Sequence, residues 1–275
     1  MQYREEMLKP LAKAAIINSI GSYAPELDEV FCGDRYRKLS NNEREMMLSL
    51  SDQKSQEYLV FGIGIPHKAF NSHEEKAEHD EYQSKKIKFI QAIIKSKQQK
   101  SGELYDLLKI PIVYTSFILS TKESVKFEDI YEAYNVIEHA AHKGDFSQEF
   151  AYIFLNIVGK FPIGSGLYFI SNRTKQIEKA IVSSLYPENF DEPVCKQVTK
   201  GQIQSMGQQE IIICRQDNLY YEDVRYKSDY DPEYFKSRYQ DQLVWNANAQ
   251  WEIQISAKLF WKKDVNFLPE KTCEQ

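Results

Sequence analysis

The segment 161–194 constrains the fold more than any other part of the chain. An apolar helical run at 150–158 precedes a Phe-Pro-Ile-Gly-Ser turn at 161–165. Apolar residues then alternate from position 167, as in a strand that buries one face. A polar turn at 187–193 leads into another strand. The sequence therefore predicts the order helix, turn, strand, turn, strand in this region.

Before this segment the pattern is helical, from Glu5 to Gly159. The first apolar stripe ends at Gly21 and comprises Met7, Leu8, Leu11, Ala15 and Ile16. Ser40 followed by Glu43 is typical of a capping box at a helix start. We expect that helix to bury Met46, Met47 and Leu50.

Three further helical regions follow. A long charged helix is predicted at 75–97, with Ile87, Ile90, Ile93 and Ile94 facing inward. The stretch 104–119 is apolar, and Pro111 should kink it or start a new helix. Helices at 127–142 and 146–160 are separated by Gly144, a residue favoured where a helix ends.

After residue 160 the pattern changes to strands. Residues 211–214 and 251–261 have strand character, and the tyrosine-rich segment 220–239 lies between them. Asp231 before Pro232 is typical of a helix start. We expect an α+β protein, mainly α, in which a helical bundle at 1–160 is followed by a small β-containing end at 161–198 and an α+β extension at 199–275.

Composition excludes several classes of protein. The net charge of −5 over 275 residues gives no electrostatic case for a nucleic-acid partner. No apolar run approaches the ~20 residues that span a bilayer. The N-terminus lacks the apolar core of a signal peptide, and the four cysteines form no CxxC pair. These features favour a cytoplasmic protein with reduced thiols and no membrane insertion.

The order of elements around 161–194 resembles the C-terminal end of HD-GYP domains, the metal-dependent cyclic di-GMP phosphodiesterases of bacteria. The resemblance covers roughly residues 8–198. It implies an HD-type helical bundle, and it implies that metal ligands should lie at defined positions along the helices.

On that resemblance, the positions of the family's metal ligands are occupied by residues that bind metal ions poorly. The run Ala14–Ser22 matches the family's Ala-Ala-Leu-Leu-His-Asp-Ile-Gly-Lys, but Asn18 and Ser19 replace His-Asp. A later ligand histidine falls at Leu50, and a later aspartate falls at Tyr114. Amide, hydroxyl and aliphatic groups are poor ligands for divalent transition metals. The alternative reading of Asn18 and Ser19 is an ordinary polar helix end.

The region 67–88 leaves two alternatives open. A metal site rebuilt from His67, His73, His79 and Asp80 is one, although the charged surroundings favour a solvated helix start. The other is nucleotide binding without metal, in which the charge of Lys85, Lys86 and Lys88 partly replaces the family's phosphate-binding groups.

The sequence thus predicts a pseudoenzyme without cofactor, acting in signalling or as a scaffold through protein contacts. A cyclic di-GMP sensor without hydrolysis and a phosphohydrolase with a rebuilt metal site are the alternatives. The tyrosines of 220–239 are expected either to form a recognition surface or to pack a helix onto the sheet.

Overall fold

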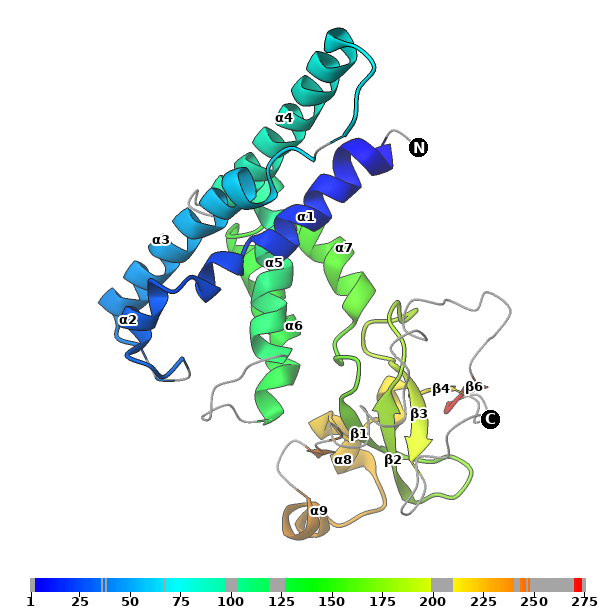
Figure 1. The fold of residues 1–275 in the computed structure, drawn as a ribbon. Helices are drawn as coiled ribbons and strands as arrows, with labels where there is room; N and C mark the ends of the chain where they lie inside the picture. Colours follow the sequence, from blue (N-terminus) through cyan, green and yellow to red (C-terminus); the bar gives the residue numbers. More distant parts are fainter. Residues whose placement is uncertain are drawn as a thin grey trace. The chain divides into compact units, whose positions relative to one another are not determined.

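The computed structural model describes residues 3–35, 37, 39–66, 68–96, 103–118, 127–198, 210–239, 243–245, 247 and 270–273. Helices come first and a small sheet follows, so the expected α+β class is confirmed (Figure 1). The chain divides into two compact units. The first is Met1–Ile112 with Thr121–Glu123, and the second is Val113–Ser120 with Ser124–Gln275.

The division falls inside helix α5 (Glu103–Ile118), well before the change of pattern near residue 160. Pro111 lies within α5 and neither starts a new helix nor ends this one. Beyond it, Tyr114 of α5 meets Phe154 edge to face, with ring centroids 5.3 Å apart. The helices before the sheet therefore belong to the same unit as the sheet, whereas the sequence pattern had grouped them with the first helices.

The first unit is entirely helical within its described residues. In chain order it contains a π-helix (Arg4–Leu8), α1 (Lys9–Ile17), a 3-10 helix (Ile20–Tyr23), α2 (Leu27–Phe31), α3 (Asn41–Glu57), a π-helix (Tyr58–Ile63), α4 (His73–Ser96) and the first part of α5.

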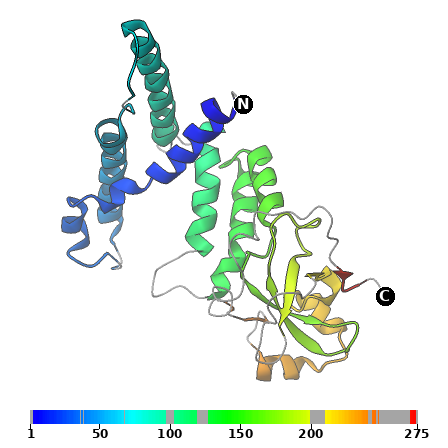
Figure 2. The ribbon, with the colours of Figure 1, turned by 45° about the vertical axis from the view of Figure 1, so that its right-hand side comes forward.

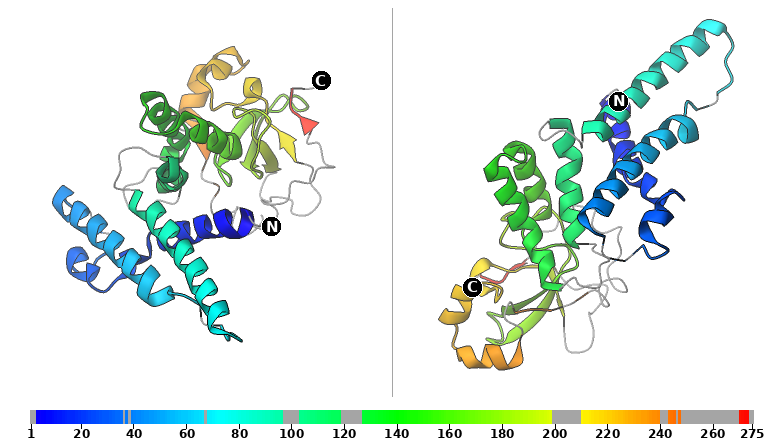
Figure 3. Two further views of the ribbon diagram at one scale, coloured as in Figure 1. Left: turned by 90° about the horizontal axis from the view of Figure 1, so that it is seen from above. Right: turned by 90° about the vertical axis from the view of Figure 1, so that its left-hand side faces the viewer.

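The core of the first unit forms where α1 crosses α4 (Figure 3). The isoleucines expected on the inner face of α4 lie in it: Ile90, Ile93 and Ile94 are buried, and Ile87 packs partly buried beside them. Ala14 and Ile17 are the contribution of α1. Burial of aliphatic side chains here is the main stabilising term of the unit.

Helix α3 does not bury the residues expected from its pattern. Met46 is 59% exposed, and Met47 and Leu50 are only partly buried. The buried side instead carries Ser51 and Ser55. Small side chains are needed there because the backbone of the 3-10 helix approaches α3 closely, as described for the site below.

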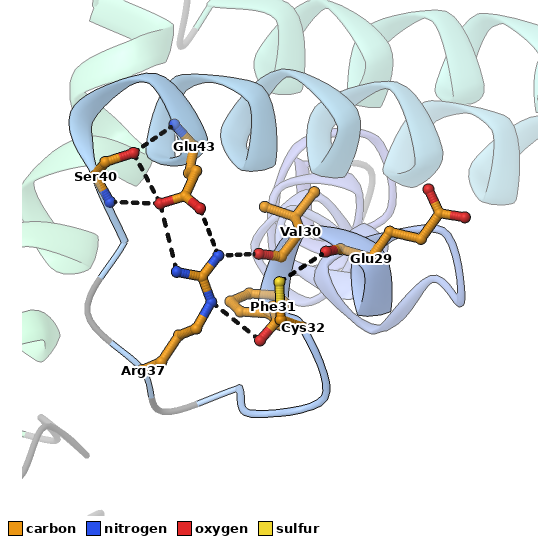
Figure 4. A network of polar contacts seen from close by, with 7 residues as sticks. All are labelled: Glu29, Val30, Phe31, Cys32, Arg37, Ser40 and Glu43. Atoms are coloured by element: carbon orange, nitrogen blue, oxygen red, sulfur yellow. Dashed lines mark hydrogen bonds and ion pairs between the residues drawn. The ribbon is translucent and has the colours of Figure 1, made fainter.

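A polar network joins the end of α2 to the start of α3 (Figure 4). Arg37 donates from Nε to the carbonyl of Phe31 at 3.0 Å and from its terminal nitrogens to the carbonyl of Val30 and to Glu43. Glu43 also accepts from the backbone and hydroxyl of Ser40 at 2.8 and 2.7 Å. The expected capping box is confirmed, and Arg37 extends it to the carbonyls of Val30 and Phe31 at the end of α2.

Acidification is expected to weaken this network. Hydrogen bonding to Arg37, and then to Ser40, lowers the pKa of Glu43 from 4.5 to about 2. A lowered pKa means that the stabilisation is present above the unfolded-state value and is lost as the pH falls through the folded-state value. From pH 4.5 down to about 2, the melting temperature of the wild type should fall more steeply than that of Glu43→Gln.

Circular dichroism melts over this pH range measure the effect. Glu45→Gln, at an exposed position of the same helix, is the matched control and should follow the wild type. Parallel pH profiles for wild type and Glu43→Gln would show that the network contributes nothing to stability.

The second unit places two helices beside a mixed sheet. After a 3-10 helix (Phe127–Tyr131) come α6 (Glu132–Lys143) and α7 (Gln148–Val158), which pack on each other. Gly144 ends α6 with φ of 81°, as expected for a helix stop. The strands are β1 (Gly166–Ile170), β2 (Ile177–Val182), β3 (Val194–Val198), β4 (Ile211–Ile212), β5 (Val244–Trp245) and β6 (Glu270–Lys271).

The sheet order is β5-β1-β2-β3-β4-β6. All pairs are antiparallel except β4 with β6. The two strands predicted around 161–194 are β1 and β3, and β2, which the sequence pattern did not predict, lies between them and completes a meander (Figure 2). Leu167 lies opposite Ala180, which sets the register that buries both. The strand expected at 251–261 lies outside the described residues.

Each face of the sheet has its own apolar cluster. On one face, Leu167 and Phe169 pack against Tyr131 and Phe161, which come from the segments before the sheet. On the other face, Tyr168 and Ile170 pack against α8 (Glu222–Lys227) and α9 (Pro232–Arg238). Side chains that alternate along a strand point to opposite faces, so β1 contributes to both clusters.

The tyrosines of 220–239 mostly serve packing. Tyr221, Tyr230, Tyr234 and Tyr239 lie in the cluster that fastens α8 and α9 to the sheet, and Tyr220 lies against Phe161 on the other face. Tyr226 is 69% exposed. The side chain of Asp231 accepts from the backbone of Glu233 at 2.9 Å, so the predicted helix start is confirmed.

Cys214 and Cys273 form a disulfide, so the expectation of reduced thiols is wrong for this pair. The two residues are 59 apart in sequence and are brought together by the pairing of β4 with β6. The spacing of the cysteines along the chain does not predict this disulfide, because its geometry depends on how the two segments meet in the fold. Cys32 (exposed) and Cys195 (buried) are free.

Candidate functional site

The positions that resemble the family's His-Asp pair form a packed junction between α1 and α3. Asn18 ends α1, and its backbone N–H donates to Ala14 at 2.9 Å. The hydroxyl of Ser55 donates to the carbonyl of Asn18 at 3.3 Å and accepts from the N–H of Gly21 at 2.9 Å. Ser19 is exposed. The junction is held by backbone hydrogen bonds through one buried serine.

Gly21 is required by this junction. A Cβ at position 21 would lie 1.9 Å from the carbonyl oxygen of Ser51 and 2.6 Å from the backbone nitrogen of Ser55. No side chain fits between atoms at such distances, so the two backbones meet directly. The glycine that the resemblance shares with the family has a packing role in this structure.

The other two positions are equally unsuited to a metal. Leu50 is a partly buried aliphatic side chain of α3. Tyr114 belongs to the second unit, where burial raises the pKa of its phenol and so keeps it protonated. An amide, a hydroxyl, an aliphatic chain and a protonated phenol are not a donor set that fits a transition-metal centre.

The histidines of the first unit lie on and before α4. His67 lies outside the described residues. His79 places Nδ1 3.4 Å from Oδ1 of Asp80, and its ring packs against Phe70 with centroids 4.9 Å apart. Within the described ranges, no three or more His, Cys, Asp or Glu side chains gather closely enough to hold a metal ion.

A cavity of about 570 Å³ opens between the first turns of α4 and the segment before it. His73 and Asp80, seven residues apart, both line it, as expected for residues that share a helix face. His79 does not line the cavity. The other lining residues are Ile65, Pro66, Lys68, Phe70, Asn71, Ser72 and Lys76. Two lysines and one aspartate give the lining of this cavity a net positive charge.

The three lysines suggested for nucleotide binding lie further along α4 and do not line the cavity. Lys85 pairs with Glu81 at 2.7 Å, and both side chains are mostly exposed. The ammonium group of Lys86 lies 4.2 Å from the ring centroid of Tyr82, within the range of a cation–π contact. Lys88 is exposed.

Helix α1 is apolar on two sides, which the sequence pattern did not separate. Its buried side carries Ala14 and Ile17. Of the stripe read from the sequence, Leu11 is partly buried, whereas Leu8 is 47% and Ile16 is 75% exposed. The stripe therefore exists, but most of it faces away from the core of the first unit. Apolar residues that are exposed along one face of a helix are typical of an interaction surface.

The second unit has a cluster of charged and aromatic side chains. Lys160 lies 5.1 Å from the ring centroid of Tyr221 and 3.8 Å from a carboxylate oxygen of Asp191. Arg215 stacks on the same tyrosine at 4.2 Å and binds Asp223 through two hydrogen bonds of 3.0 Å. Since each cation in this cluster has a carboxylate partner, the arrangement stabilises the fold.

Comparison of the chain with family models, with curated proteins and with solved structures finds no match. Among the helices described, none has both the length and the apolar character needed to cross a membrane.

Proposed function

We propose that the chain is a catalytically inactive, HD-GYP-like protein that acts in signalling or as a scaffold, through contact with another protein. The donor set at Asn18, Ser19, Leu50 and Tyr114 supports the loss of catalysis, because hydrolysis in that family depends on metal-activated water. Close packing at Gly21 further supports a structural role for the junction.

The uncovered side of α1 is the observation that carries the proposal. Leu8 and Ile16 are two helical turns apart on this side, and the exposed Ala12 and Ala15 lie between them. Small residues between larger ones allow another helix to approach closely, as in ridges-into-grooves packing. The exposed Lys13 lies at the border of the stripe. The partner is therefore an amphipathic helix of another protein, with an acidic residue at the edge of its apolar face.

A photo-crosslinking residue at position 16, used in the cells that make this protein, should capture that partner. Tyr226 is as exposed as Ile16 but lies in the second unit, so a crosslinker at position 226 is the control. With the purified partner, Ile16→Glu should weaken binding by about tenfold or more, because a charge then has to be buried in an apolar contact. Tyr226→Glu should bind as the wild type does. Equal affinity of Ile16→Glu and wild type would exclude α1 as the docking surface.

Catalytic inactivity is tested separately. The wild type, incubated with cyclic di-GMP and Mn²⁺ or Fe²⁺, should hydrolyse no more than the buffer does. Turnover that is abolished by a chelator would contradict the proposal and favour a phosphohydrolase with a rebuilt metal site. His67 would then be the first residue to replace, together with His73.

A cyclic di-GMP or related nucleotide sensor is the second candidate, favoured by the cavity before α4. Lys68 and Lys76 present positive charge where phosphates would bind, and His73 lines the same cavity. Calorimetric titration with cyclic di-GMP in the absence of metal separates the two candidates. Binding that is weakened by Lys76→Glu would establish the sensor. No heat at millimolar nucleotide would remove it.

A further inference from the structure

The last described residues, 270–273, are held to the sheet by a small set of contacts. Glu270 and Lys271 pair with β4. The N–H of Thr272 donates to Ile212 at 2.9 Å, and its hydroxyl accepts from the N–H of Cys214 at 3.0 Å. These contacts cover the outer edge of β4, and the disulfide from Cys273 to Cys214 closes the segment over it.

Thr272 also connects this segment to a buried carboxylate. Its hydroxyl donates to Oδ2 of Asp217 at 2.6 Å, and its carbonyl accepts from Asn172. Asp217 is 8% exposed, and among the described residues its carboxylate also accepts a longer hydrogen bond of 3.5 Å from Asn172. The carboxylate thus depends on Thr272 for its close hydrogen bond. The position of residues 270–273 therefore determines whether the outer edge of β4 is paired and whether the carboxylate of Asp217 keeps its close hydrogen bond.

Only two residues of this segment pair with β4, and short pairings of this kind are marginal by themselves. The disulfide supplies the missing stabilisation by restricting the unfolded chain. Its two sulfurs differ in accessibility, because Cys214 is buried and Cys273 is only partly buried. A thiol from solution therefore reaches the sulfur of Cys273 first.

We propose that the Cys214–Cys273 disulfide is a redox latch, and that its reduction by a thiol releases residues 270–273 and uncovers the outer edge of β4. A thiolate attacks Sγ of Cys273, forms a mixed disulfide with it and displaces the thiolate of Cys214. A second thiolate then attacks the mixed disulfide, so that both cysteines are reduced and two external thiols become one disulfide. The opened edge offers unpaired backbone groups to another strand.

Hydrogen exchange with and without dithiothreitol tests the latch. In the reduced protein, the amides of Cys214 and Thr272 should exchange about tenfold faster or more, because each loses its hydrogen-bond partner. Peptides from β1 and β2 should be unchanged. Cys273→Ser should exchange rapidly without dithiothreitol, and Cys32→Ser, which removes an exposed thiol outside the disulfide, should respond as the wild type does.

Two results would overturn the proposal. Alkylation of the denatured, unreduced protein should label two cysteines, and labelling of all four would show that the disulfide does not form. Unchanged exchange at β4 after complete reduction, confirmed by labelling of all four cysteines, would show that the segment stays in place without its covalent bond. Neither result bears on the contact proposed for α1, which lies in the other unit.

Discussion

Phe161→Ala is expected to destabilise the second unit by about 3–5 kcal/mol, the range typical of a phenylalanine deleted from a well-packed core. The ring is 2% exposed and lies edge to face against Tyr220, with centroids 5.2 Å apart. It also meets Tyr131 and Tyr221 at 6.2 and 6.1 Å. Tyr131 and the adjacent pair Tyr220 and Tyr221 come from two separate segments, so the three rings cannot close the cavity by moving together.

Tryptophan fluorescence reports this change, because Trp245 lies in β5 of the second unit. The midpoint of urea unfolding for Phe161→Ala should fall sharply, with an unchanged slope. Tyr226→Ala removes an aromatic ring that is 69% exposed, and it should cost less than about 1 kcal/mol. Similar losses for both variants would mean that Phe161 is not central to the core.

Gly21→Ala is expected to destabilise the first unit by about 3 kcal/mol or more, because overpacking against rigid backbone costs at least as much as overpacking against side chains. The added methyl would lie 1.9 Å from a carbonyl oxygen of α3, so the 3-10 helix has to move away. That movement breaks the hydrogen bond from Gly21 to Ser55, which is buried and cannot be replaced by water.

Hydrogen exchange of peptides from α1 and α3, followed by mass spectrometry, locates the damage. Exchange should rise in both helices of Gly21→Ala, while tryptophan fluorescence continues to show a native second unit. Ser19→Ala, at an exposed position two residues earlier, is the control and should leave exchange unchanged. A Gly21→Ala protein as protected as the wild type would contradict the close approach of the two backbones.

Much of the local structure could be predicted because its causes lie within a few residues. The capping box at Ser40 and the start of α9 at Asp231 each depend on a side chain that binds backbone nearby, and the stop at Gly144 depends on a residue that adopts a positive φ without strain. The turn after Phe161 and the strands β1 and β3 follow from glycine, proline and alternation, whereas β2 between them was not predicted. The inward face of α4 followed from helical periodicity alone.

The faces predicted to be buried were wrong for two helices, α1 and α3. The pattern of α1 holds apolar residues on both sides, and only the approach of α4 decides that Ala14 and Ile17 are buried while Ile16 is exposed. On α3, the methionines are more apolar than the serines. The serines are nevertheless buried, because only small side chains allow the approach of Gly21.

The sequence by itself determined the class of the fold, the longer helices, the strands β1, β3 and β4, and the chemical character of the residues at the suspected ligand positions. Tertiary structure alone decided the division within α5 and the disulfide between residues 59 apart. The physical reason is the distance along the chain over which the interactions act. Caps, turns and periodicity arise from interactions over a few residues, whereas interfaces, disulfides and cavities arise from chain segments that meet only after folding.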